Sequence, residues 1–302
     1  MERRKFLQQS AVLGAGVALS PSVLAYPKRP DSLRKITILH TNDTHSNIET
    51  FPVTHATFPG RGGVALRHTL IQQIRREEKN VLLFDAGDIF QGTPYFNKFN
   101  GTLEMKLMSM LGYDCATMGN HDFDIGLDGF LNAKRYANFP FVCSNYDFSN
   151  TELRDEMLPY TTFLKEDIKV GVFGLGVELE GLIMKANYGE TRYLDPIEMA
   201  NRQARHLRME EECDLVICLS HLGYQYRQNK VSDIVLASAT ENIDLIIGGH
   251  THTFLDKPSY TKNLAGSLVL INQVGWAGLA LGRIDFYLGE RKKHKGFQLI
   301  PV

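Results

Sequence analysis

The chain has 302 residues, of which 43% are hydrophobic, so it can bury one large core or two small ones. Its formal net charge is −1 at pH 7. This balance excludes a strong electrostatic attraction to nucleic acid or to an anionic membrane, and we expect no specific nucleic-acid binding.

The N-terminal segment has the pattern of an export signal. A basic run at residues 3–5 precedes an apolar stretch at 11–19, and residues 23–25 (Val-Leu-Ala) resemble a cleavage site. The paired arginines are typical of a twin-arginine signal. A membrane anchor is the alternative, but the apolar stretch is too short to span a bilayer comfortably. We predict a signal over residues 1–25, a linker over 26–34, no stable membrane anchor, and a periplasmic or secreted protein.

From residue 35 onward, short apolar segments alternate with helical patterns, which is typical of an α/β domain. Single strands are predicted at 35–40, 81–84, 115–118, 139–144, 215–219 and 245–247. A hairpin is predicted at 161–174, and closing antiparallel strands at 268–271 and 281–287. Helices are predicted from residue 64, over 103–111, from 126 to about 138, from 196 to 210–212, and over 232–239.

Residues that commonly bind metals follow five of the predicted strands. In chain order these are Asp43, His45, Asp88, Asn120, His221, His250 and His252. If the strands are parallel, their ends meet at one edge of a sheet, where such side chains can converge. Carboxylates, imidazoles and one amide, with no thiolate, suit Mn, Fe, Zn or Mg better than a soft metal or an iron–sulfur cluster.

The order of these motifs resembles the calcineurin-like metallophosphatase superfamily over roughly residues 35–290. The matching segments are Asp43-x-His45, Gly87-Asp88, Gly119-Asn120-His121-Asp122, His221 and Gly249-His250-x-His252. The segments around Asp43, Asn120 and Trp276 are similar to the catalytic domain of the secreted 5′-nucleotidases. The resemblance implies an α/β fold, a four-layer α/β/β/α sandwich with a mixed, partly parallel sheet core. It also implies one catalytic domain over residues 35–302.

The resemblance further implies a dinuclear site with two divalent metal ions. Mn, Zn or Fe is favoured, and Mg is allowed. One ion would be held by Asp43, His45, Asp88 and His252, and the other by Asp88, Asn120, His221 and His250. Two such ions about 3.5–4 Å apart can clamp a phosphoryl oxygen and generate a bridging hydroxide for attack.

His121 and Asp124 would form a catalytic pair in the same family pattern. His121 would stabilise phosphoryl charge or protonate the leaving oxygen, and Asp124 would fix its tautomer. The alternative for Asp124 is a helix cap near Gly126.

Two residues depart from the nucleotidase pattern. Ser46 follows His45 where glycine is usual, and Asp122 stands where glutamate is usual.

Secreted 5′-nucleotidases also carry a C-terminal domain whose aromatic side chains sandwich the nucleobase. We expect that domain to be absent here, so the resemblance does not extend to base recognition.

We therefore expect an exported, metal-dependent phosphomonoesterase of the 5′-nucleotidase type that acts on a small phosphate ester, such as a nucleotide. One alternative is a phosphodiesterase for cyclic nucleotides or sugar nucleotides. A third interpretation is a metal-bound binding protein that needs a separate partner chain.

Overall fold

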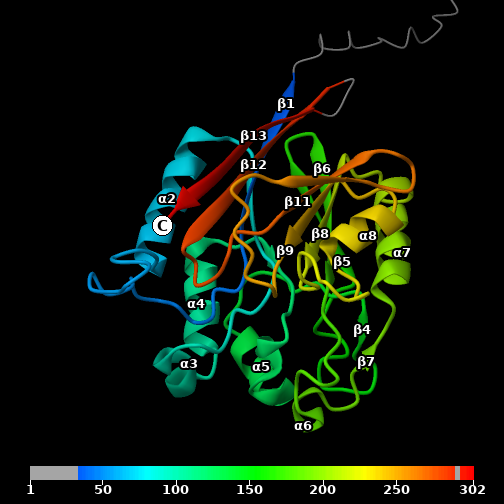
Figure 1. The fold of residues 1–302 in the computed structure, drawn as a ribbon. Coiled ribbons are helices and arrows are strands. Elements are labelled where there is room, and N and C mark those ends of the chain that lie inside the picture. Colours follow the sequence, from blue (N-terminus) through cyan, green and yellow to red (C-terminus); the bar gives the residue numbers. More distant parts are fainter. Residues whose placement is uncertain (1–32, 290–292) are drawn as a thin grey trace, which may run out of the picture. The chain divides into compact units, whose positions relative to one another are not determined.

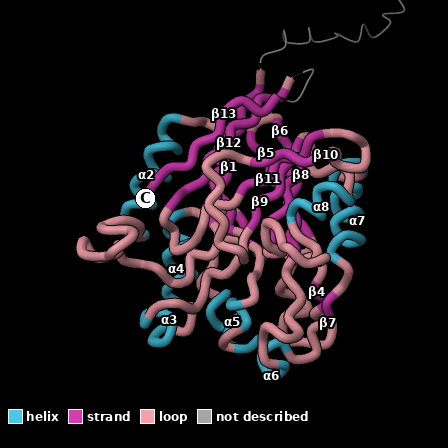
Figure 2. The backbone as a smooth tube through the Cα atoms, in the orientation of Figure 1, coloured by secondary structure: helices cyan, strands magenta, loops and turns pink. Residues whose placement is uncertain are grey.

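The computed structural model describes residues 33–289 and 293–302 (Figure 1). The predicted export signal and most of the predicted linker lie outside the described residues. The arrangement of helices, strands and loops over the described part is traced in Figure 2.

Strands make up most of the regular structure of the described residues. They are β1 (Arg34–Thr41), β2 (Val81–Asp85), β3 (Cys115–Ala116), β4 (Tyr146–Asp147), β5 (Tyr160–Lys165), β6 (Ile168–Leu175), β7 (Arg192–Tyr193), β8 (Leu215–Ser220), β9 (Leu245–Gly248), β10 (Ser259–Lys262), β11 (Leu268–Asn272), β12 (Ala280–Leu288) and β13 (Lys293–Pro301). The helices are α2 (Val64–Glu77), α3 (Pro94–Phe99), α4 (Thr102–Leu111), α5 (Gly126–Lys134), α6 (Lys185–Tyr188), α7 (Pro196–Met209), α8 (Asp233–Ala239) and the 3-10 helix η1 (His121–Phe123).

Two mixed sheets carry most of these strands. The first has the order β13-β12-β1-β2-β3, with β1, β2 and β3 parallel and β12 and β13 antiparallel. The second has the order β10-β11-β9-β8-β6-β5, with β11, β9, β8 and β6 parallel and the two edge strands antiparallel. The five strands that precede predicted ligands are thus divided between two sheets, so the expectation of one shared sheet edge is wrong.

Alternating side chains along the central strands explain why the sheets stack. Ile38 and Leu82 of the first sheet pack with Val172 and Ile217 of the second in one core. The intervening residues face the other way, because successive side chains of a strand point to opposite faces. A strand buried on both sides therefore reads as a continuous apolar run.

Helices cover the outer face of each sheet. Leu83 of β2 packs in a core with Ile71 of α2 and with residues of α4 and α5. Val216 of β8 packs with Ala204 of α7 and with α8. Together with the core between the sheets, these contacts confirm the predicted four-layer α/β/β/α sandwich.

Some of the predicted elements are wrong. Residues 139–144 contain only isolated bridges at Phe141 and Val142, because Pro140 has no N–H to donate to a ladder. The helix from Gly126 ends at Lys134 rather than near Asn138, and the chain closes in tight turns, with Tyr136 N donating to the Ala133 carbonyl. The strand predicted at 115–118 is reduced to the two residues of β3.

Candidate metal centre

The loops after β1 and β2 run side by side and bring the first three predicted ligands together. The backbone N–H groups of Asp43 and His45 donate to the carbonyls of Gly87 and Asp88, at 2.9 and 3.0 Å. The loop after β9 joins them, since the N–H of His250 donates to the Asp43 carboxylate at 3.0 Å. Loops from both sheets therefore meet at Asp43.

Backbone strain is concentrated in these loops. Five of the seven predicted ligands have positive φ, although none is glycine: Asp43 (48°), His45 (47°), Asp88 (56°), His250 (71°) and His252 (51°). Such residues cost free energy and persist where surrounding contacts hold them, which is common at functional sites.

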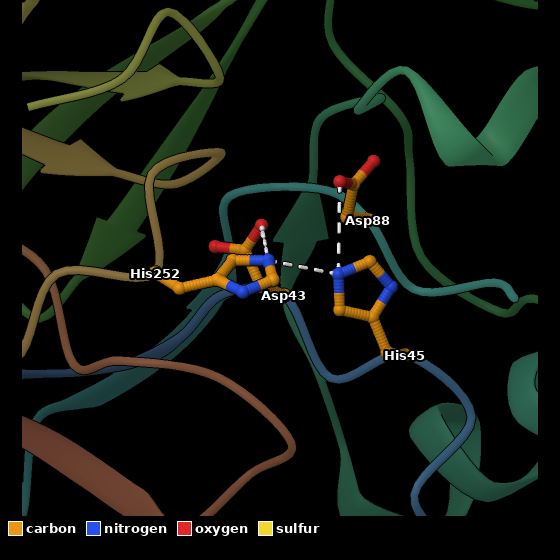
Figure 3. A group of neighbouring side chains, drawn as sticks. All are labelled: Asp43, His45, Asp88 and His252. Atoms are coloured by element: carbon orange, nitrogen blue, oxygen red, sulfur yellow. Dashed lines mark hydrogen bonds and ion pairs between the residues drawn. The ribbon is translucent and has the colours of Figure 1, made fainter. Parts of the chain in front are cut away.

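One group of four side chains converges as predicted for a first ion. His252 Nε2 lies 3.0 Å from His45 Nε2 and 3.4 Å from Asp43 Oδ1. His45 Nε2 lies 3.8 Å from Asp88 Oδ2. Figure 3 shows these four side chains turned toward one another. Candidate ligand atoms of all four lie within 4.8 Å of one another, so the group could hold a metal ion.

A second group shares Asp88 with the first. Asp88, His221 and His250 also offer ligand atoms within 4.8 Å of one another. His221 Nε2 is 3.1 Å from Asp88 Oδ2, and Asn120 Oδ1 is 2.8 Å from His250 Nδ1. The structure thus places all seven predicted ligand residues in two adjoining groups that meet at one carboxylate.

Two of the imidazoles are oriented by backbone carbonyls. His45 Nδ1 lies 3.1 Å from the Phe90 carbonyl, and His221 Nδ1 lies 2.7 Å from the Ala86 carbonyl. A carbonyl only accepts, so each ring carries its proton on Nδ1 and turns Nε2 toward the ligand group. This is the usual support for a metal-binding histidine.

The donor set fits a divalent cation. His221 Nε2 is buried, and two carboxylates lie beside it, with Asp88 Oδ2 at 3.1 Å and Asp43 Oδ1 at 3.9 Å. Asp43, Asp88 and His221 are at most 1% exposed, so solvent does not compensate their charges. Two buried carboxylates beside one imidazole are costly unless a positive charge, either a proton or a metal ion, binds among them. Oxygen and imidazole ligands suit zinc, manganese or iron.

In the second ligand group, His221 and Asp88 shift each other's pKa. Burial alone would lower the pKa of His221, but the Asp88 carboxylate beside it raises that pKa to about 10. Burial likewise opposes ionisation of Asp88, yet His221 holds the pKa of this carboxyl well below its usual range. Burial lowers the pKa of His250 to about 4, so its ring is neutral near pH 7.

His121 and Asp124 form a pair beside the two ligand groups. His121 Nδ1 is 2.8 Å from Asp124 Oδ2, and the His121 ring lies 5.4 Å from that of His45. The hydrogen bond to Asp124 raises the pKa of His121. Both side chains remain partly exposed. Asp124 does not cap α5, whose N-cap is Ile125, so its carboxylate is directed to His121 instead.

Asp122 organises the ligand loops, a role that the sequence interpretation missed. Its carboxylate accepts four backbone hydrogen bonds at 2.8–3.1 Å, from the N–H groups of Asp88, Ile89, Phe90 and Gly119. Burial raises the pKa of Asp122 to about 7, and the backbone donors oppose that rise. The departure from glutamate at this position was the only sequence signal for it.

Close approach of two loops explains the glycine before Asn120. A Cβ atom on Gly119 would lie 2.1 Å from Asp88 Oδ1, so a larger residue would displace the carboxylate that both groups share.

An aromatic ring also supports one ligand. The Trp276 ring stacks on His252, with ring centroids 5.8 Å apart and planes 8° from parallel. Trp276 belongs to the loop whose Ala277 N–H donates to the Asp43 carbonyl at 2.7 Å. The loop after β11 therefore contacts two residues of the first ligand group, His252 and Asp43.

Comparison with known families decides the assignment. The family model for calcineurin-like phosphoesterases matches residues 36–254. The chain belongs to this family. The match begins in β1 and ends just after His252, so it contains both ligand groups of the calcineurin-like phosphoesterase domain.

Relatives of this phosphoesterase include nucleotide-hydrolysing enzymes. The chain is 33% identical over 293 residues to the trifunctional nucleotide phosphoesterase protein YfkN of Bacillus subtilis, covering 86% of this chain and 18% of the relative. It is 30% identical over 319 residues to a 5′-nucleotidase of Vibrio cholerae, covering 97% of this chain and 56% of the relative. The solved 5′-nucleotidase precursor of Thermus thermophilus superposes with a TM-score of 0.81 at 30% identity, covering 89% of this chain and 55% of that one.

The chain therefore spans about half the length, or less, of these relatives. Among the described residues, no helix is both long and apolar enough to cross a membrane.

Proposed function

We propose that the protein is a metal-dependent phosphoester hydrolase of the 5′-nucleotidase type, in a single catalytic domain over residues 35–302. The observation that carries the proposal is the pair of adjoining ligand groups that share Asp88. Membership of the calcineurin-like phosphoesterase family and the resemblance to 5′-nucleotidases support the same reaction class.

In this proposal two divalent ions, Mn, Zn, Fe or Mg, occupy the adjoining groups. Asp43, His45, Asp88 and His252 hold one, and Asp88, Asn120, His221 and His250 hold the other. A carboxylate suits the shared position because it is anionic and has two oxygens. Asn120 adds a neutral oxygen, which leaves the site cationic toward an anionic phosphate. When bound, the ions would supply the Lewis-acid chemistry that activates water and the phosphoryl group.

His121 acts on the substrate side of the site. Its Nδ1 is engaged by Asp124, so Nε2 is the ring nitrogen free to face a phosphate ester. A proton held there can stabilise phosphoryl charge and pass to the leaving oxygen. Asp124 keeps the ring in this tautomer and favours its protonated form.

A phosphodiesterase is the second candidate. The Bacillus subtilis relative is a trifunctional nucleotide phosphoesterase, a description that does not restrict it to monoesters. The chain covers only part of the length of its relatives. We therefore also propose that a separate partner chain could select the natural substrate.

Metal analysis combined with an ester panel tests the proposal. We expect the full chain to bind close to two divalent ions and to hydrolyse nucleoside 5′-monophosphates. His250→Ala should lose metal and activity, whereas His206→Ala, which alters a contact with Tyr160 in the second sheet, should not. Metal-loaded protein that hydrolyses only diesters would favour the second candidate. Turnover of neither ester class would contradict the enzyme assignment and favour a binding role.

Export through the twin-arginine route is part of the same proposal. The mature protein in the periplasm or medium should begin near Tyr26, and replacing Arg3 and Arg4 by lysine should reduce its export. N-terminal sequencing of exported protein that still begins at Met1 would contradict a cleaved signal.

A further inference from the structure

Ser46 occupies a strained position directly after a candidate ligand. Its φ is 53°, in the left-handed region that glycine adopts easily and serine does not. Its hydroxyl donates to Glu104 Oε1 at 2.5 Å. The Thr93 hydroxyl donates to the Ser46 carbonyl at 2.8 Å. Side-chain contacts thus hold a residue type that the backbone does not favour there.

Behind Ser46 lie two buried charges with unsatisfied atoms. Glu104 of α4 is 4% exposed and Arg67 of α2 is 3% exposed. Glu104 Oε2 and Arg67 Nε and Nη1 have no hydrogen-bond partner among the described residues. Leaving such groups without a partner in a protein interior is expensive, and native structures usually satisfy them.

These groups line one small cavity. Ser46, Arg67 and Glu104 line it together with apolar residues such as Ile89 and Met108, and it measures about 20 Å³. That volume is enough for about one water molecule. A guanidinium only donates hydrogen bonds and a carboxylate only accepts them. The occupant must accept from Arg67 and donate to Glu104, which water does and which a simple anion or metal cation does not.

Arg67 also contacts the other side of the site. A Cβ atom on Gly278 would lie 1.7 Å from Arg67 Nη1, so the guanidinium lies directly against this backbone. Gly278 follows Ala277, whose N–H donates to the Asp43 carbonyl. Arg67 is thereby packed between the loop of His45 and the loop that supports Asp43.

We propose that Ser46, Glu104 and one water molecule shared with Arg67 form a buried polar support that positions His45 for metal binding. The support acts through the backbone, because Ser46 follows His45 directly and its N–H donates to the Ile89 carbonyl at 2.9 Å. Without Glu104, the serine would lose the contact that holds its left-handed conformation, and the His45 imidazole would move. This inference rests on the proposed function of the metal centre.

The test compares metal affinity in matched variants of the full chain. Mn²⁺ affinity is measured on metal-stripped protein by competition with a chelator. Loss of a residue that supports a metal ligand typically weakens binding about 10–100-fold. We expect about 10-fold weaker binding for Ser46→Ala, because alanine disfavours positive φ as serine does but has no hydroxyl to hold it there. Ser46→Gly should bind within about twofold of the parent, because glycine adopts positive φ without support.

Glu104 is tested in both backgrounds. Glu104→Gln should weaken Mn²⁺ binding about 10-fold in the parent chain, but only about twofold in the Ser46→Gly chain. Glu156→Gln, which alters an ion pair with Lys134 far from the cavity, serves as the matched control and should have no effect. If Glu104→Gln fails to fold, the comparison of Ser46→Ala with Ser46→Gly still decides the question.

Several results would overturn the inference. Parental affinity in Ser46→Ala and Glu104→Gln would remove the positioning role, as would an equal loss from Glu104→Gln in both backgrounds. A high-resolution crystal structure without water density between Arg67 and Glu104 would remove the shared water. Parent protein that binds Mn²⁺ but hydrolyses no ester would overturn only the proposed function, while the affinity comparison would still test the support.

Discussion

Asp124 controls the charge on His121 through a single 2.8 Å hydrogen bond. That bond is the largest cause of the raised pKa of His121, ahead of the opposing effect of burial. If His121 delivers a proton to the leaving oxygen, the protonated ring is the active form. Activity then declines as pH rises through the pKa of His121.

Removing the Asp124 charge should move this decline. We expect Asp124→Asn to lower the pKa of His121, so that the falling limb of the kcat/KM profile shifts to lower pH. His121→Ala should keep the metal content and lose about 10²–10⁴-fold in rate, the usual range for a general acid. Asp128→Asn, an exposed carboxylate on α5, is the control and should leave the profile unchanged. An unshifted profile in Asp124→Asn would contradict the role given to the pair.

At the scale of elements, Asp122 connects two ligand loops that belong to different strands. The turn after β2 donates three backbone N–H groups to it, and the loop after β3 donates a fourth. Both loops present candidate metal ligands, Asp88 in one and Asn120 in the other. Their spacing therefore depends on one buried carboxylate.

Asp122→Asn should weaken this connection, because the amide NH₂ would face N–H donors that need an acceptor. Leaving buried donors unsatisfied costs roughly 1–3 kcal/mol. We expect a lower melting temperature for the metal-free protein and weaker binding at both metal positions, measured by thermal denaturation and by metal titration. Asp155→Asn, on an exposed turn, should change neither. A variant that loses one metal but keeps the other at full affinity would show that Asp122 does not couple the loops.

Sequence patterns located the buried parallel strands well and the short elements badly. The strands predicted at 35–40, 81–84, 215–219 and 245–247 appear as β1, β2, β8 and β9, each longer by one or two residues. Their apolar runs are continuous because both faces of each strand are buried. Such a run can be recognised from neighbouring residues alone. α3, β4 and β7 were not predicted, since their position depends on tertiary contacts.

The candidate ligand residues could be singled out because each follows a recognisable strand. Their supports could not, because Asp122, Glu104 and Arg67 act on residues distant in the sequence. A carboxylate that accepts backbone donors from two loops looks, in sequence, like any aspartate in a turn. The division of the strands between two sheets was likewise not visible in the apolar runs themselves.

At the scale of the whole described domain, each sheet contributes part of the candidate metal centre. Asp43, His45, Asp88 and Asn120 follow strands of the first sheet, whereas His221, His250 and His252 follow strands of the second. Each ligand group draws on both sheets, which otherwise meet through an apolar core. Bound metal would therefore cross-link the two sheets at their loop edge.

Metal should accordingly stabilise the fold as a unit. A ligand that binds only the native state adds about 2.7 kcal/mol at one hundred times its dissociation constant. We expect Mn²⁺ or Zn²⁺ to raise the melting temperature, measured by calorimetry, and to slow hydrogen exchange in β8 and β9 as well as in β1 and β2. His250→Ala should reduce the rise. Protection confined to one sheet would contradict a centre that both sheets share.

This stabilisation should increase with pH. In the metal-free fold the pKa of His221 is raised to about 10, so near pH 7 its ring holds a proton that the metal must displace. The ring of His250, with a pKa lowered to about 4, is already neutral there. Metal binding should therefore release at least one proton, measurable by titration calorimetry in buffers of different ionisation enthalpy. Binding without proton release would contradict this assignment.

The distribution of ligands along the chain also dictates when a cation can be captured. Asp43 emerges early in synthesis and His252 more than two hundred residues later, so a nascent polypeptide presents only fragments of the binding set. Cation choice is thus deferred until both sheets have docked. If the proposed centre binds metal, the ion would then come from the pool available in whichever compartment folding is completed.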